Sequence, residues 1–156
     1  MNQIFERIRT PMGDLYCVIE REKIVLLHFD SQQISHNAQK SPHPLIQECQ
    51  SQLDAYFKSS LKTFSLSLEI KGSDFKKRAL QALQNLAYGE MITYQTLAQM
   101  AGSPKAYRAI GSLLAQNPIL ILIPCHRVIL SNGQLGGYTW GKEKKKKLLK
   151  LEGHQK

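Results

Sequence analysis

The sequence is poor in cysteine and has no long apolar run. Its three cysteines, Cys17, Cys49 and Cys125, are widely spaced, with no C-x-x-C pair and no paired histidines. This pattern argues against a disulfide framework and a structural metal site. No stretch of about 18 apolar residues predicts a transmembrane helix, and Glu6 and Arg7 stand where a signal peptide needs its apolar region. We therefore expect a soluble, cytoplasmic protein without a metal ion.

Acidic residues are scarce in one half of the chain. Residues 1–71 carry eight Lys and Arg against eight Asp and Glu, whereas residues 72–156 carry thirteen against four. The whole net charge of +9 therefore lies in the second half. A basic half joined to a neutral one suggests that one part meets a polyanion, and nucleic acid is the first candidate. A basic surface that serves only solubility explains the charge equally well.

The length of 156 residues suits one domain or two small lobes with a real core, since such a chain buries roughly two thirds of its unfolded surface. The sequence pattern changes at KGSD, residues 71–74. We expect an α+β fold, with an N-terminal α/β lobe over residues 1–71 and a mostly helical C-terminal lobe over residues 72–156.

The first lobe reads as strands and one helix. Residues 4–9 look like a strand, and residues 15–29 look like a hairpin around a polar corner. Residues 31–43 are polar without a period and should form a loop. After Pro44 apolar residues recur at helical spacing, and residues 64–70 then alternate strictly, as in a strand. No catalytic residue types cluster in this lobe, so we expect it to be a scaffold.

The second lobe shows helical spacing broken by glycine and proline. Ser73 can cap a first helix, a second follows Thr93, and Ser103 before a proline can cap a third. Helix, glycine-containing turn and helix within a basic segment indicate a helix-turn-helix. The run ILILI, residues 119–123, should be buried and extended.

The last helix is expected over residues 142–152, and Gly153 ends it. Its lysine run, Lys144 to Lys147, is more often a solvated face than a phosphate-binding track. We assign this run no role in a site.

The segment IPCHRVI, residues 123–129, places Cys125 beside His126. A free thiol has a pKa near 8.5, so it needs a nearby imidazole, oriented by a carboxylate, to react. Adjacent side chains on an extended backbone face opposite ways, so contact requires a bridging water or the bend that Pro124 allows. Glu152 is the carboxylate best placed to orient the imidazole. From these residues alone, a nucleophile and a packed core cysteine both remain open.

A match to a family decides between them. The chain contains, in order, GEMITYQTLAQMAGSPKAYRAIG, NP, ILIPCHRVI, GGYTWG and LEGH. This ordered set resembles the O6-alkylguanine-DNA alkyltransferases, also called methylated-DNA–protein-cysteine methyltransferases, closely from Tyr94 to Gly153 and loosely over the whole chain. The resemblance implies an N-terminal lobe with a ribonuclease-H-like sheet and a C-terminal lobe built on a winged helix-turn-helix.

The resemblance also implies catalytic roles for matching residues. Cys125 is the nucleophile and alkyl acceptor. His126 acts as the base through a water and is held by Glu152. Asn117 holds the active-site turn by hydrogen bonds, and Tyr94 donates toward the departing guanine and stabilises the flipped nucleotide.

Further matching residues contact DNA or form the base pocket. Arg108 enters the base stack as a finger and fills the vacated space. Trp140 stands where some relatives have glycine, which suggests a bulkier pocket rim and less tolerance of large alkyl groups. The other implied residues are Gln95, Ser103 and Ser131 for DNA contact, and Val128, Tyr138 and Thr139 for the pocket.

The activity that the resemblance implies is direct DNA repair. An alkyl group, chiefly methyl, passes from O6-alkylguanine, and from O4-alkylthymine, to Cys125 after the damaged nucleotide has left the base stack. The helix-turn-helix binds the minor groove of double-stranded DNA. A thioether has no easy hydrolytic exit, so one molecule repairs one lesion. The protein needs no cofactor and no obligate protein partner, and should act as a monomer.

Two rival interpretations belong to other functional classes. One is a non-enzymatic DNA-binding module, either a regulator or an alkyltransferase-like damage sensor, but such sensors lack the acceptor that Cys125 provides. The other is a cysteine hydrolase, which would turn over and would need an oxyanion site that the sequence does not reveal.

Overall fold

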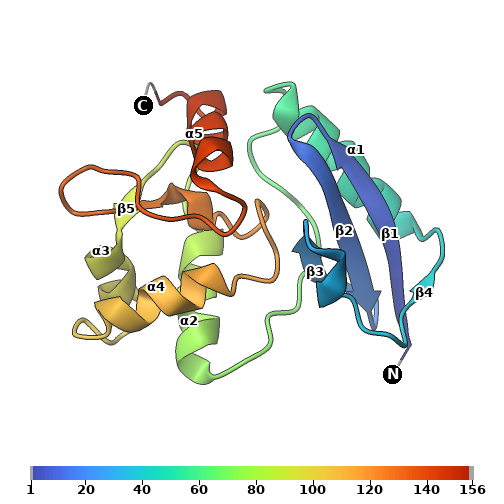
Figure 1. Ribbon diagram of the computed structural model, residues 1–156, viewed down its shortest axis with the longest axis horizontal. Helices are drawn as coiled ribbons and strands as arrows, with labels where there is room; N and C mark the ends of the chain where they lie inside the picture. Colours follow the sequence, from blue (N-terminus) through green and yellow to red (C-terminus); the bar gives the residue numbers. More distant parts are fainter. Residues whose placement is uncertain (1, 155–156) are drawn as a thin grey trace. The chain divides into compact units, whose positions relative to one another are not determined.

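The structure is a computed structural model that describes residues 2–154. The chain divides into two compact units, Met1–Glu69 and Ile70–Lys156. Figure 1 shows strands and a long helix in the first unit and mostly helices in the second. The predicted α+β fold is therefore confirmed.

The N-terminal unit is built on a sheet with the strand order β3-β2-β1-β4. The first three strands form two consecutive antiparallel hairpins, as predicted, whereas β4 runs parallel to β1. Part of the segment that we expected to be only a loop, residues 31–43, forms β4 and a short 3-10 helix. The elements are β1 (Gln3–Thr10), β2 (Gly13–Glu20), β3 (Lys23–His28), η1 (Ser31–Gln33) and β4 (Gln39–Lys40).

The helix predicted after Pro44 is α1 (Pro44–Phe57). His43 precedes it, and its Nδ1 accepts a hydrogen bond from the backbone N–H of Leu45 at 3.0 Å, which satisfies one open donor of the first turn. α1 packs against β1 and β2 (Figure 1). The buried apolar residues of its inner face are Ile46, Cys49, Leu53 and Tyr56.

Residues 64–70 do not form the predicted strand. They meet β3 at a single bridge between Leu68 and Ile24. Before that bridge, the side chain of Gln52 takes the place of a strand partner, because its Oε1 accepts from the backbone N–H of Ser65 at 2.9 Å. The alternation was therefore read correctly as one-sided burial but wrongly as ladder pairing.

The C-terminal unit holds the predicted helix-turn-helix. Ser73 caps its helix as predicted, since its side chain accepts from the backbone N–H of Lys76. The second helix follows Thr93 as predicted, and the Thr93 side chain caps it by accepting from the backbone N–H of Thr96. The turn over residues 101–106 separates the two helices of the motif. The elements are α2 (Asp74–Gln84), β5 (Ile92–Thr93), α3 (Tyr94–Met100), α4 (Tyr107–Ala115), η2 (Cys125–Arg127), β6 (Val128–Ile129) and α5 (Lys142–Leu151).

The predicted cap of the third helix is wrong. α4 begins at Tyr107, and the residue before it, Ala106, makes no side-chain cap hydrogen bond. Ser103 lies earlier, in a turn where its backbone carbonyl accepts from Ala106 N–H at 2.9 Å. Since this turn uses residues 103–106, the helix starts later than the serine-proline signal indicated.

The run over residues 119–123 is buried as predicted but is not extended. The backbone N–H of Leu122 donates to the carbonyl of Leu120 at 2.7 Å, and Ile121 between them has a φ of 69°. This is the rare, strained form of the γ-turn, and a β-branched residue seldom adopts a positive φ. The chain therefore reverses sharply just before Cys125.

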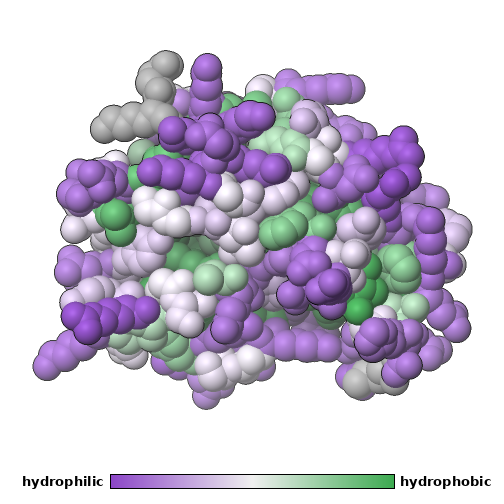
Figure 2. Space-filling model, viewed as in Figure 1, coloured by the Kyte–Doolittle hydropathy of each residue, from purple (hydrophilic) through white to green (hydrophobic). Residues whose placement is uncertain are grey.

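Figure 2 shows hydrophilic side chains over much of the visible face, with apolar groups in small patches between them. Among residues 2–154, no helix has both the length and the apolar character needed to cross a membrane.

Candidate active site

Cys125 opens η2 directly after the strained turn, and its side chain is buried. The side chain of Asn117 fixes both. Its Nδ2 donates to Cys125 Sγ at 3.1 Å and to the carbonyl of Ile123 at 3.0 Å, and its Oδ1 accepts from the backbone N–H of Ile119 at 3.0 Å. One buried amide therefore closes the turn and positions the thiol.

His126 is fully buried, and its ring bonds to Glu152 rather than directly to Cys125. Its Nε2 lies 2.8 Å from Glu152 Oε2. Burial lowers the pKa of His126, against the opposing effect of Glu152, so the imidazole is neutral at pH 7. Because the carboxylate can only accept, Nε2 carries the proton. The other nitrogen, Nδ1, is buried and has no hydrogen-bond partner among residues 2–154, so it is available to accept a proton.

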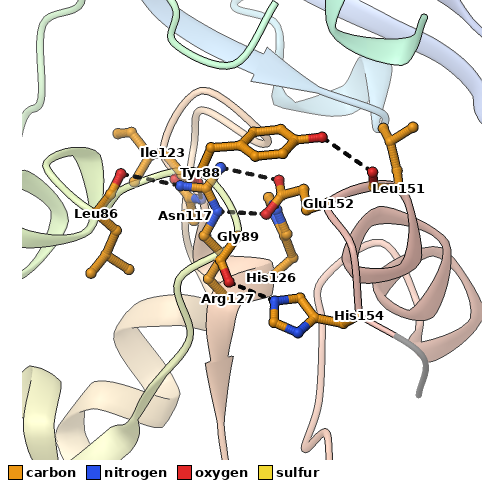
Figure 3. Close-up of polar contacts among 10 residues, drawn as sticks. All are labelled: Leu86, Tyr88, Gly89, Asn117, Ile123, His126, Arg127, Leu151, Glu152 and His154. Atoms are coloured by element: carbon orange, nitrogen blue, oxygen red, sulfur yellow. Dashed lines mark hydrogen bonds and ion pairs between the residues drawn. The ribbon is translucent and has the colours of Figure 1, made fainter. Parts of the chain in front are cut away.

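Glu152 also binds Arg127 in a buried cluster (Figure 3). Arg127 Nε donates to Oε1 at 2.8 Å, and Nη2 donates to Oε2 at 3.1 Å, the bidentate arrangement that favours an ionised carboxylate. Burial alone would raise the pKa of Glu152, but the hydrogen bonds from His126 and Arg127 hold it well below its usual range. The carboxylate is therefore ionised and its charge is balanced by the Arg127 guanidinium, while His126 stays neutral.

The end of α5 that carries Glu152 is tied to the segment before β5 (Figure 3). The hydroxyl of Tyr88 donates to the carbonyl of Leu151 at 3.1 Å, and Nε2 of His154 lies 2.6 Å from the carbonyl of Gly89. These contacts fix the position of the carboxylate relative to the segment that leads into α3.

The His126–Glu152 pair predicts acid sensitivity of the C-terminal unit. Folding lowers both pKa values, so the unfolded chain binds more protons. The free energy of unfolding therefore decreases as the pH is lowered. The loss begins below about pH 6.5 for the histidine and deepens below about pH 4.3 for the glutamate. Trp140 is the only tryptophan, so its fluorescence in urea titrations at several pH values measures this unit. A free energy of unfolding that is constant from pH 7 to pH 4 would contradict the assignment.

Lys145 is a site residue that the sequence interpretation missed. Its side chain is fully buried, and Nζ donates to the backbone carbonyls of Val128, Leu135 and Gly137 at 2.7, 2.5 and 3.0 Å. The solvated-face interpretation of the lysine run is therefore wrong for this position. The signal was present, because Lys145 lies at helical spacing before Leu148, which is also buried.

The protonation state of the Cys125 thiol depends on its burial and on the charge of Lys145. Burial raises the pKa of the Cys125 thiol to about 11, against the lowering effects of the Asn117 hydrogen bond and the Lys145 charge. Burial likewise lowers the pKa of Lys145 to about 8, although Cys125 opposes this. The three N–H groups of the ammonium are already used by carbonyls, so Lys145 acts on the thiol through charge. Cys125 is protonated at rest and needs a base when it reacts.

A pocket of about 170 Å³ opens over Cys125. At roughly 30 Å³ per water molecule, this is the space of about six waters, enough for one planar base. Val128 and Trp140 are buried but are not among the lining residues, so the structure does not give Trp140 the expected place at the rim; its ring lies under Lys144 instead, 5.3 Å from Nζ. The pocket is lined by Tyr94, Gly111, Leu114, Ala115, Cys125, Gly137, Tyr138 and Thr139.

An open groove adjoins the pocket. Of the residues predicted to contact DNA, Gln95, Arg108 and Ser131 line it, whereas Ser103 does not. Tyr94, at the first position of α3, lines both the groove and the pocket. The structure thus brings most of the predicted DNA-contacting residues to the mouth of the cavity that holds the thiol.

A helix-turn-helix unit whose groove leads to a buried thiol, imidazole and carboxylate defines a class of proteins that act on DNA through a cysteine. Two family models match this chain: the DNA-binding domain of 6-O-methylguanine DNA methyltransferase over residues 74–154, and the ribonuclease-like domain of the same enzyme over residues 4–70. The chain belongs to the 6-O-methylguanine DNA methyltransferase family. The family resemblance seen in the sequence is confirmed.

Relatives match over most of the chain. The constitutive methylated-DNA–protein-cysteine methyltransferase of Bacillus subtilis is 39% identical over 150 residues, which cover 92% of this chain and 91% of the relative. The Mycobacterium leprae methyltransferase is 47% identical over 108 residues, which cover 69% of this chain and 66% of that protein. The crystal structure of Mycobacterium tuberculosis OGT in complex with DNA has a TM-score of 0.88 at 34% identity, covering 97% of this chain and 92% of that one.

Proposed function

We propose that the protein repairs double-stranded DNA by moving an alkyl group, chiefly methyl, from O6-alkylguanine to Cys125 in a single turnover. O4-alkylthymine is a second substrate of the same reaction. The observation that carries the proposal is the thiol at the floor of a base-sized pocket, which adjoins the groove of a helix-turn-helix. The names of the relatives, methylated-DNA–protein-cysteine methyltransferases, support the same chemistry.

The reaction joins Sγ to the alkyl carbon and breaks the bond between that carbon and guanine O6. Because the Cys125 thiol is protonated at rest, its proton must leave as sulfur attacks, and His126 Nδ1 accepts it through a bridging water. Glu152 and Arg127 hold the imidazole in the required tautomer. Guanine leaves with the electron pair of the broken bond and takes a proton from the Tyr94 hydroxyl. The thioether stays on the protein, so no cofactor is required.

DNA binding must expose the alkylated base, because O6 is out of reach of a thiol inside the duplex. The α3–α4 motif lies in the minor groove, Gln95 and Ser131 contact the backbone, and Arg108 replaces the flipped base in the stack. The DNA complex of the M. tuberculosis relative supports a DNA-bound state of this fold. Ser103 does not line the protein groove, so in this proposal it contacts DNA outside that groove.

The test is the intact mass of the protein after incubation with a duplex that contains one O6-methylguanine. Wild type is expected to gain one methyl group per molecule, on the peptide that contains Cys125, and to stop there. Cys125→Ser should gain none. Continued conversion of lesions beyond one per protein would indicate a hydrolase, and an unchanged mass would indicate a DNA-binding sensor; either result rejects the proposal.

The proposed substrate and acceptor bear on where the protein works and in which oligomeric state. Since the DNA lesion is intracellular and the acceptor is part of the chain, we infer that the protein works in the cytoplasm as a monomer. It requires no obligate protein partner.

A further inference from the structure

Exposed apolar side chains gather beside the proposed DNA finger. Over residues 2–154, the large hydrophobic side chains that are substantially exposed are Met100 at 49%, Tyr107 at 41% and Leu130 at 36%. Tyr107 and Leu130 both line the groove that contains Arg108, whereas Met100 does not. A single exposed apolar side chain is ordinary, but two that line one groove form an apolar patch of the kind that marks a contact site.

One face of α4 connects this groove to the pocket. Tyr107, Gly111 and Leu114 recur at the i, i+4 and i+7 positions that share a helix face. Tyr107 lines the groove, Leu114 lines the pocket, and Gly111 lines both. Gly111 has no side chain to block the passage between them. Tyr107 therefore stands at the outer end of a continuous path that leads to Cys125.

We propose that Tyr107 is a further DNA-contacting residue, whose ring packs against the base step beside the flipped nucleotide while Arg108 fills the vacated space. This inference rests on the proposed repair function. Proteins that bend DNA through the minor groove commonly insert apolar side chains at a base step and unstack it. The aromatic face, rather than the hydroxyl, makes the contact, and Leu130, which lines the same groove, adds a second apolar group to it.

The test compares the repair of duplex DNA with the reaction of a free base. Tyr107→Ala is expected to weaken single-turnover repair of an O6-methylguanine duplex about tenfold at subsaturating DNA, the scale of one lost aromatic contact with a base. Its reaction with free O6-benzylguanine should change less than twofold. Tyr107→Phe should keep wild-type repair because it keeps the ring. Met100→Ala is the matched control and should match wild type in both reactions.

A second readout follows base unstacking directly. A fluorescent adenine analogue beside the lesion should brighten when wild type or Tyr107→Phe binds, and less with Tyr107→Ala. The proposed contact would be rejected if Tyr107→Ala lost equal rate with the duplex and with the free base, or if it lost no rate with the duplex. If wild type itself gained no methyl group, the proposed function would fail instead, and the fluorescence change would still judge the contact.

Discussion

Replacing Glu152 with glutamine is expected to slow alkyl transfer about 100-fold and to lower the free energy of unfolding of the C-terminal unit by about 3 kcal/mol. The carboxylate accepts from His126 and twice from Arg127 in a buried cluster. Glutamine keeps the shape but removes the charge, so the arginine is left buried without its counterion. Glutamine also has a single acceptor oxygen beside an NH2 donor, so it cannot accept from both His126 and Arg127 and no longer fixes the tautomer of the imidazole.

The matched control is Glu143→Gln on the same helix. That carboxylate is 84% exposed and lies 3.6 Å from Lys146, and exposed pairs of this kind contribute little. Single-turnover rates and urea titrations followed by Trp140 fluorescence should therefore separate the two variants. Glu152→Gln should also remove the part of the acid destabilisation that lies below about pH 4.3. Wild-type transfer by Glu152→Gln would show that His126 needs no carboxylate.

Local sequence patterns predicted the elements because each is set by local physics. The hairpins follow from alternation and a polar corner, and α1 follows from helical spacing after Pro44. Ser73 was predicted as a cap because a hydroxyl directly before an apolar helix commonly accepts from the first turn. Such features depend on residues a few positions apart, which a single sequence displays.

Two of the wrong predictions depend on hydrogen bonds between a side chain and the backbone, which apolar periodicity does not display. Asn117 bonds across the turn and holds Ile121 at a positive φ. An apolar run such as residues 119–123 does not predict such a turn. Residues 64–70 lose their ladder to the side chain of Gln52, thirteen positions away. Propensity predicts an extended chain in both cases, and side-chain hydrogen bonds to the backbone overrule it.

The candidate site was predicted through family resemblance rather than through geometry. The bend at Pro124 was the one local clue that His126 need not point opposite to Cys125, and η2 is indeed a 3-10 turn. Arg127 was missed although it stands within the quoted motif, because a cation beside a proposed base suggests no role until the carboxylate that it neutralises is seen.

Replacing Lys145 with methionine is expected to lower the free energy of unfolding of the C-terminal unit by about 4 kcal/mol, since three carbonyls, two of them buried, lose their donor at about 1–3 kcal/mol for each buried group before relaxation. The carbonyls belong to Val128, Leu135 and Gly137, so the change loosens the wall beside the pocket. Loss of the nearby positive charge also raises the pKa of the Cys125 thiol above its value of about 11. Alkyl transfer should slow by up to about tenfold for each unit of that rise, because the thiolate fraction falls tenfold while the more basic thiolate is a somewhat better nucleophile.

Lys147→Met separates this effect from the general basic charge of α5. Lys147 is exposed in the same lysine run, so its loss should leave the unfolding free energy and the transfer rate near wild type while removing an equal charge. The pH dependence of thiol alkylation by iodoacetamide measures the Cys125 pKa in each variant. If Lys145→Met and Lys147→Met unfold alike and alkylate alike, the buried ammonium is no more than another surface cation. A loss confined to Lys145→Met identifies it as the buried charge that holds the pocket wall and stabilises the forming thiolate.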